Sequence, residues 1–132
     1  MKSIENMTRV EKIAACARAA YEANRTFCIA IAEEVIPPPW EDAKPVWLSG
    51  ISNTVEAVLI GDGPSSLHKK WLDVMSLAGW KYGVVKDSAK KESPKLASYN
   101  DLPGTAKRQY QLTVDIVRAM AKALDLKVRT VR

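Results

Sequence analysis

Residues 8–35 have the sequence TRVEKIAACARAAYEANRTFCIAIAEEV, which predicts a long amphipathic helix at the start of the fold. Thr8 and Glu11 have the spacing of a capping box, in which each side chain pairs with a free backbone amide of the first turn. Asn24 interrupts the apolar face of this helix, so its side-chain amide needs hydrogen-bond partners. The apolar face recurs at steps of three and four residues and consists of Val10, Ile13, Ala14, Ala17, Ala20, Tyr21, Phe27, Cys28, Ile31, Ala32 and Val35.

Three prolines at 37–39 should end this helix, because each lacks an amide proton and holds the backbone extended. A second helix is predicted to start at Pro45, since proline suits a first helical turn. The glycines and proline of residues 61–64 predict a turn. Ser65 or Ser66 is then expected to cap a third helix.

Gly79 is well placed to end the third helix. The segment that follows it predicts a small β-hairpin. Residues 80–85 alternate in side-chain type as a short strand does. Residues 95–99 are the expected antiparallel partner, and residues 86–94 would form the loop between the two strands.

Asn100 or Asp101 is expected to cap the last helix, with Pro103 in its first turn. The predicted fold class is mainly α, with compact antiparallel helices and a small two-stranded β-hairpin. We expect one domain over residues 1–132, with its core at about 9–124 and a solvated basic tail at 125–132.

The composition fits a single globular domain, with 132 residues of which 47% are hydrophobic. The net charge of +5 is spread along the chain, so nucleic acid is a disfavoured partner. Cys16 and Cys28 would lie about 18 Å apart along one helix, too far for a disulfide. We find no signal peptide and no apolar run long enough for a membrane span. These features predict a cytoplasmic protein with no membrane association.

The sequence contains no recognisable catalytic set, so we expect the protein not to be an enzyme. His68 is the only histidine, which makes a nucleophile and base pair improbable, and it forms no zinc-ligand pattern with the cysteines. The GDGPSS stretch lacks the lysine of a phosphate loop. The carboxylates Glu33, Glu34, Glu41 and Asp42 fit solvated groups better than an acid and base pair. No cofactor and no metal is expected.

Candidate ligand-binding residues cluster between His68 and Lys95, where aromatic rings and cations lie close in sequence. Each has a structural alternative: Trp71 a core or subunit contact, His68 a surface position, and Trp80 and Tyr82 packing on one face of a strand. The lysines at 86, 90, 91 and 95 form either a solvated loop or a mobile cationic flap over phosphates. Outside this cluster, Trp47 is expected in the core. The ligand-binding candidates are Trp71, His68, Lys86, Lys90, Lys91, Tyr82, Trp40 and Arg25.

Trp40 either lines a groove or packs the prolines on the core, while Asn24 and Arg25 either fasten the hairpin or touch the ligand.

The chain resembles the ryanodine receptor repeat, or RyR domain, which occurs in tandem in calcium release channels and as single copies in bacterial and phage proteins. The motifs that carry the resemblance run from about Ala17 to about Met120: ARAAYEANRTFC, PPPWEDA, HKKW, GWKYGVVKD and YNDLP. The chain departs from the family where Ser93 and Pro94 replace a common His-Pro, and where Met75 replaces a residue that is often basic.

The resemblance implies a non-catalytic module and a cleft for an adenine nucleotide, with Trp71 stacked on the base. Because a single repeat would supply half of the cleft that tandem repeats form, we expect a homodimer in which two copies of Trp71 face each other. The function expected is therefore the recognition or sequestration of an adenine nucleotide or a nucleotide-derived signal. The alternative is a protein-interaction module with no small-molecule ligand, and a nucleotide hydrolase is the least favoured class.

Overall fold

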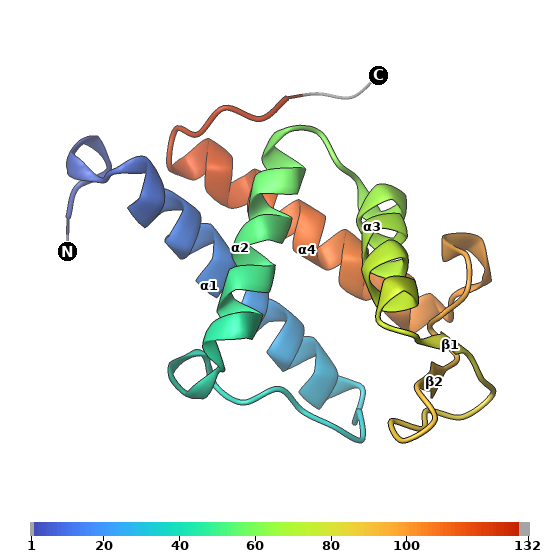
Figure 1. The fold of residues 1–132 in the computed structure, drawn as a ribbon. Helices are drawn as coiled ribbons and strands as arrows, with labels where there is room; N and C mark the ends of the chain where they lie inside the picture. The colour runs from blue at the N-terminus through green and yellow to red at the C-terminus, as the bar shows by residue number, and fades with distance from the viewer. Residues whose placement is uncertain (1, 130–132) are drawn as a thin grey trace.

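The computed structural model describes residues 2–129 and shows a mainly helical fold with one small sheet (Figure 1). The fold class predicted from the sequence is confirmed in this coarser form. Four helices make up most of it: α1 (Arg9–Ala30), α2 (Pro45–Leu59), α3 (Pro64–Leu77) and α4 (Gly104–Ala123). Three short 3-10 helices, η1 (Ile4–Asn6), η2 (Trp40–Asp42) and η3 (Tyr99–Asp101), and two strands, β1 (Lys81–Tyr82) and β2 (Glu92–Ser93), complete it.

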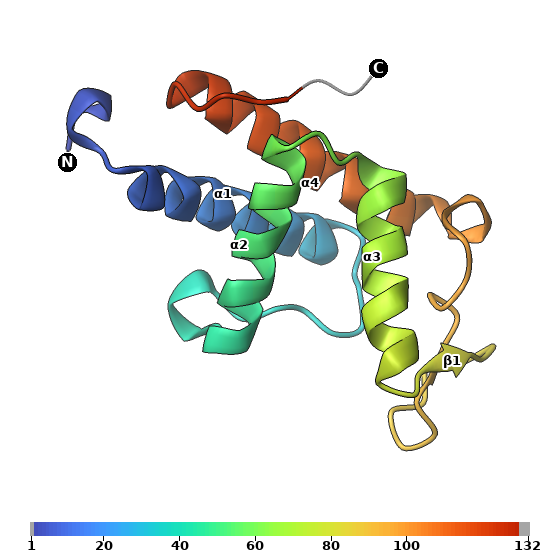
Figure 2. The same ribbon diagram turned by 45° about the horizontal axis from the view of Figure 1, so that its top comes forward.

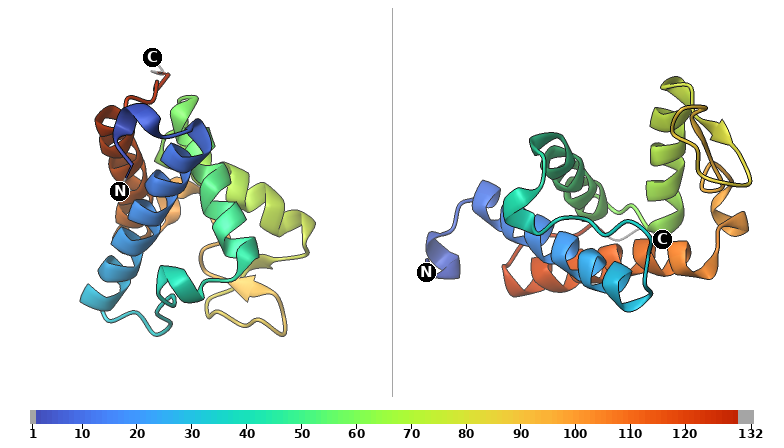
Figure 3. Two further views of the ribbon diagram at one scale, coloured as in Figure 1. Left: turned by 90° about the vertical axis from the view of Figure 1, so that its left-hand side faces the viewer. Right: turned by 90° about the horizontal axis from the view of Figure 1, so that it is seen from below.

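The helices form two layers. α1 and α4 lie side by side and antiparallel, and α2 and α3 cross the same face of this pair (Figures 1 and 2). α2 packs on both α1 and α4, whereas α3 packs chiefly on α4 and stands near its N-terminal end (Figure 3).

The core lies where α1, α2 and α4 meet, and small side chains let the helices approach closely. Cys16, Ala17 and Ala20 of α1 are fully buried, as are Val55 and Val58 of α2. Val114, Val117 and Ala121 complete this core from α4. The predicted apolar face was wrong at Ala14, which is exposed, and at its ends: Val10 is 78% exposed because the helix has just begun there, and Val35 lies beyond the end of the helix.

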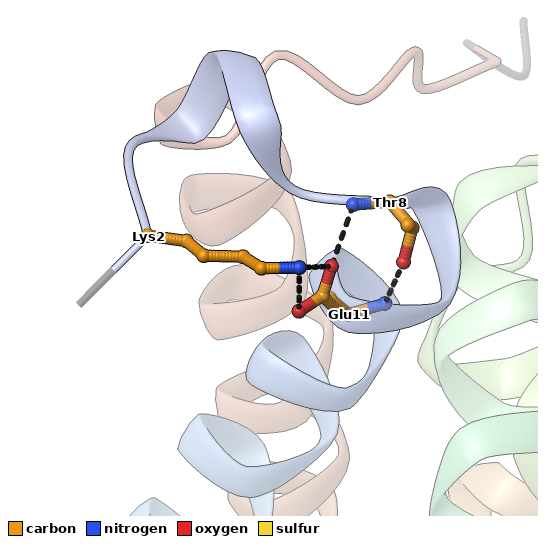
Figure 4. Close-up of polar contacts among 3 residues, drawn as sticks. All are labelled: Lys2, Thr8 and Glu11. Atoms are coloured by element: carbon orange, nitrogen blue, oxygen red, sulfur yellow. Dashed lines mark hydrogen bonds and ion pairs between the residues drawn. The ribbon is translucent and has the colours of Figure 1, made fainter.

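The predicted capping box is confirmed at the start of α1 (Figure 4). The Thr8 hydroxyl accepts a hydrogen bond from the Glu11 amide at 3.1 Å, and the Glu11 carboxylate accepts one from the Thr8 amide at 2.9 Å. Lys2 forms an ion pair with the same carboxylate. These contacts lower the pKa of Glu11, chiefly through the backbone hydrogen bond.

The prediction that the prolines at 37–39 end α1 was wrong, because the helix already ends at Ala30. The Glu33 amide donates to the Cys28 carbonyl at 2.9 Å, and the Ala32 amide donates to the Ile29 carbonyl at 3.1 Å. This is the Schellman pattern, and Ala32 accordingly has a left-handed φ of 54°. The chain turns there and presents residues 33–37 beside the end of α1.

The predicted start of α2 at Pro45 is confirmed, whereas the predicted starts of α3 and α4 need correction. α3 begins at Pro64, and its N-cap is Gly63. Ser66 is not the N-cap but the third residue of the helix, where its hydroxyl accepts a hydrogen bond from the Gly63 amide. α4 begins at Gly104 with Pro103 as its N-cap. The predicted cap residues of α4, Asn100 and Asp101, instead lie in η3, which is closed by backbone hydrogen bonds to the Ser98 and Tyr99 carbonyls.

The predicted antiparallel hairpin was wrong, since β1 and β2 are parallel. Lys81 pairs with Glu92, so the partner strand precedes the predicted 95–99. The chain bends first at residues 84–85 and turns again at 88–91, closed by paired backbone hydrogen bonds between Asp87 and Glu92. Two reversals bring the second strand back in the direction of the first. A Cβ on Gly83 would lie 2.6 Å from the Glu92 Cβ, so this close pairing requires glycine.

The described part of the C-terminal tail is not simply solvated as expected. Leu126 and Val128 pack against the core, and the Arg129 amide donates to the Leu59 carbonyl at 2.8 Å. The tail thus holds the end of α2, while residues 130–132 lie outside the described ones. Among the described residues, no helix combines the length and apolar character that a bilayer crossing requires.

Candidate ligand-binding cleft

A cleft of about 790 Å³ lies between α3 and the end of α1. Its α3 side consists of α3 and the segment that follows, with Trp71, Met75 and Trp80. Its α1 side consists of the last turns of α1 and residues 33–37, and α4 runs along the base of both (Figure 3, right). The volume falls within the range of small-molecule sites in proteins.

Trp71 lies on α3, half-buried, and lines the cleft. Its indole stacks on the His68 imidazole, with ring centroids 5.6 Å apart and an angle of 22° between the planes. One face of the indole is thus held by protein. A residue held in this way can stack a flat ligand without first losing much side-chain freedom.

His68 is buried, at 1% exposure, and both of its ring nitrogens are hydrogen-bonded. Nε2 lies 2.7 Å from the Ala97 carbonyl oxygen, and Nδ1 lies 2.9 Å from the Tyr110 hydroxyl. A carbonyl only accepts, so Nε2 carries the proton and Nδ1 of the neutral ring accepts from Tyr110. His68 therefore joins α3, α4 and the segment after β2, and its polar atoms are not available to a ligand.

Tyr110 is the donor in this network because it stays protonated. Burial raises its pKa to about 12, and the neighbouring Tyr99 adds to the shift. The Tyr99 and Tyr110 rings meet edge to face at 6.2 Å, and the His68 ring meets Tyr110 edge to face at 5.3 Å. The four rings of Trp71, His68, Tyr110 and Tyr99 form a continuous cluster, and all of them except Tyr99 line the cleft.

Two of the four predicted lysines line the cleft. Lys86 precedes the turn between the strands and Lys95 follows β2, and both lie on the α3 side. Lys91 instead donates from Nζ to the Ala78 carbonyl at 2.7 Å, where it caps the C-terminal end of α3. Lys90 is exposed and lies outside the cleft lining. A segment fastened in this way fits an ordered rim better than the mobile flap expected from the sequence.

The sequence profile of the RyR domain matches residues 54–129, which include α3, both cleft lysines and α4. The chain belongs to the RyR domain family. No curated protein and no solved structure matches the chain. The matched segment begins within α2, so α1 and the proline segment lie before it. The α1 side of the cleft comes from that preceding part.

The remaining predicted site residues lie elsewhere in this RyR domain. Tyr82, the second residue of β1, is 57% exposed and outside the cleft lining. Arg25 donates from Nε to the Pro37 carbonyl at 3.0 Å and so fastens the proline segment to α1. Trp40 packs edge to face on Tyr21 beside the core, away from the cleft. Trp47 was wrongly expected in the core; it is 47% exposed and lies near the Lys44 ammonium.

The sequence did not predict that three polar residues meet at the junction of α1 and α4, namely Asn24, Thr113 and Gln109. Asn24 donates from Nδ2 to the Thr113 hydroxyl oxygen at 2.5 Å and to the Ala20 carbonyl at 3.2 Å. Gln109 donates from Nε2 to the Cys28 sulfur at 3.2 Å. Glu33 and Glu34 also line the cleft. The one signal in the sequence was a polar residue, Asn24, on the apolar face of α1. Its partner Thr113 could not be predicted, because it is 89 residues away.

Among residues 2–129 there is no group of three or more histidine, cysteine or acidic side chains placed to hold a metal ion. Both cysteines are buried thiols, and burial raises the pKa of Cys16.

Proposed function

We propose that this RyR domain is a non-catalytic module that binds an adenine nucleotide or a nucleotide-derived signal in the cleft around Trp71. Recognition or sequestration of such a ligand would take place in the cytoplasm of a bacterial cell or a phage-infected host. One observation carries the proposal: a supported indole and two lysines line the same cleft.

Stacking is the first element of the proposal. Every nucleobase offers a flat face, and stacking on an aromatic side chain is worth about 1–3 kcal/mol per base. Trp71 lies against His68 on one face and lines the cleft, and Trp80 lines the same cleft. The family membership supports this assignment as well, because the resemblance places a base on the residue that matches Trp71.

Charge is the second element. Lys86 and Lys95 lie on the same side of the cleft as Trp71, and neither takes part in an ion pair among the described residues. Ammonium groups without a protein partner remain free to bind phosphate oxygens. A ligand that combines a flat ring with phosphate would use both features at once.

A matched pair of lysine variants tests the role of the phosphate. We expect Lys86→Ala to weaken binding of adenosine monophosphate about 5-fold, and Lys90→Ala to leave it within about 2-fold. The nucleotide affinity of the wild type should also fall as salt rises from about 0.05 to about 0.5 M, while adenosine affinity stays constant. Calorimetric titration measures all of these affinities. Equal losses in the two variants would contradict the assignment of Lys86.

The second candidate is a protein-interaction module with no small-molecule ligand. It is favoured by exposed apolar side chains on and after α3, among them Leu77 at 90% exposure, Val74, Val84 and Val85. A second copy of the chain is one partner that would cover them, and the homodimer remains part of our proposal on that ground.

Light scattering after size-exclusion chromatography tests the homodimer. We expect a mass of about twice 14.6 kDa at micromolar concentration. If the exposed apolar side chains on and after α3 form the dimer contact, Leu77→Lys should return the protein to a monomer. A wild-type monomer, with and without adenosine monophosphate, would contradict the dimer.

A further inference from the structure

The two sides of the cleft differ in hydrogen-bonding character. The α3 side contributes the cations Lys86 and Lys95, whereas the α1 side contributes the carboxylates of Glu33 and Glu34. Neither carboxylate takes part in an ion pair or hydrogen bond with another described residue. A purely anionic ligand would meet repulsion on the α1 side, so the α1 side needs a different part of the ligand.

At the base of the cleft, the side-chain amide of Asn24 also presents an acceptor. The Thr113 hydroxyl donates to the Gln109 carbonyl at 3.0 Å, so its oxygen must accept from Asn24. The Ala20 carbonyl accepts the other hydrogen of Asn24 Nδ2. Both donor hydrogens are thereby used inside the protein. Oδ1 of Asn24, which has no partner among the described residues, is left as an acceptor.

Gln109 has a protein partner for one of its two donor hydrogens. Its Nε2 donates to the Cys28 sulfur, and its Oε1 has no partner among the described residues. Asn24, Gln109, Glu33 and Glu34 all line the cleft, and each side chain has acceptor oxygens without a partner among the described residues. These acceptor oxygens match a ligand group that donates hydrogen bonds.

We propose that these four residues form an acceptor subsite, which selects ligands whose ring carries an amino group, while Lys86 and Lys95 bind the anionic group. This inference rests on the proposed function, and it adds the direction in which the ligand lies and the chemical class of its ring. The amino edge lies toward α1, and the phosphate lies toward the segment that follows α3.

Two nucleotides that differ only in the amino group test the subsite. Adenosine monophosphate carries an exocyclic amine, and purine riboside monophosphate has no donor on its ring. We expect the wild type to bind adenosine monophosphate about 10-fold more tightly, as a hydrogen bond to a charged acceptor allows. In the variant Glu33→Gln with Glu34→Gln, and in Asn24→Ala, this ratio should fall toward one. Glu5→Gln, an exposed residue of η1, is the matched control and should keep the wild-type ratio.

The outcomes separate this inference from the proposed function. If the wild type binds both nucleotides with equal affinity, the acceptor subsite is wrong while the nucleotide cleft stands. A ratio that persists in both the glutamate and Asn24 variants, each shown by circular dichroism to be folded, also overturns the subsite. If neither nucleotide binds, the proposed function itself fails.

Discussion

Trp71→Ala is expected to weaken binding of adenosine monophosphate by about 10- to 100-fold, the range that loss of one base stack produces. The substitution removes the indole that lines the cleft and leaves the His68 ring behind it. Trp71→Phe should restore part of the affinity, because a smaller ring still stacks. Calorimetric titration gives the affinities of all three proteins.

Trp47→Ala is the matched control for this prediction. Trp47 is also a partly exposed helical tryptophan, but it lies on α2 outside the cleft lining. We expect its removal to leave the nucleotide affinity within about 2-fold, the scale of an uninvolved surface position. If both alanine variants bind the nucleotide as the wild type does, Trp71 is not the stacking residue.

His68→Leu is expected to lower the free energy of unfolding by about 2–4 kcal/mol. Leucine has a similar size, so the change chiefly removes two buried hydrogen bonds and leaves the Ala97 carbonyl and the Tyr110 hydroxyl without partners. A buried polar group left unpaired costs about 1–3 kcal/mol. Urea denaturation followed by circular dichroism measures the loss.

Two further variants are needed to interpret the stability of His68→Leu. Tyr110→Phe removes only the bond to Nδ1 and should cost about 1–2 kcal/mol, less than His68→Leu. Lys69→Ala changes the adjacent exposed residue and should stay within about 0.5 kcal/mol of the wild type. A His68→Leu protein as stable as Lys69→Ala would show that the network adds nothing to stability.

The sequence predicts the helical framework well because its signals are local. The Thr8 and Glu11 capping box acts over three residues, and the apolar spacing that predicts α1 is set by the helix itself. The break at Gly79, which has a left-handed φ of 93°, also depends on the backbone of a few residues. These features appear in the structure, whereas α1 ends before the prolines, at a Schellman turn that they do not signal.

The small sheet could not be predicted in the same way. Its direction depends on a second reversal, in which Lys91 takes a left-handed φ of 55°, a conformation that its residue type does not signal. The alternation of residues 80–85 gave no sign of the bend at 84–85. A hairpin was therefore the natural expectation, and it was wrong.

The site was predictable in its location but not in its details. Aromatic and basic residues near Trp71 indicated a ligand site, and Trp71 and Lys86 do line the cleft. The burial of His68 depends on partners 29 and 42 residues away, which no local pattern contains. The hydrogen bond from Asn24 to Thr113 could not be predicted for the same reason, because it forms only when α1 and α4 pack.

The central claim is that the cleft around Trp71 binds a nucleotide, and calorimetric titration of the wild type with adenosine monophosphate tests it most directly. We expect one nucleotide per chain, with affinity lowered by Trp71→Ala and Lys86→Ala but kept in Trp47→Ala and Lys90→Ala. Absence of binding heat across several temperatures, or equal affinities in all five proteins, would contradict the claim.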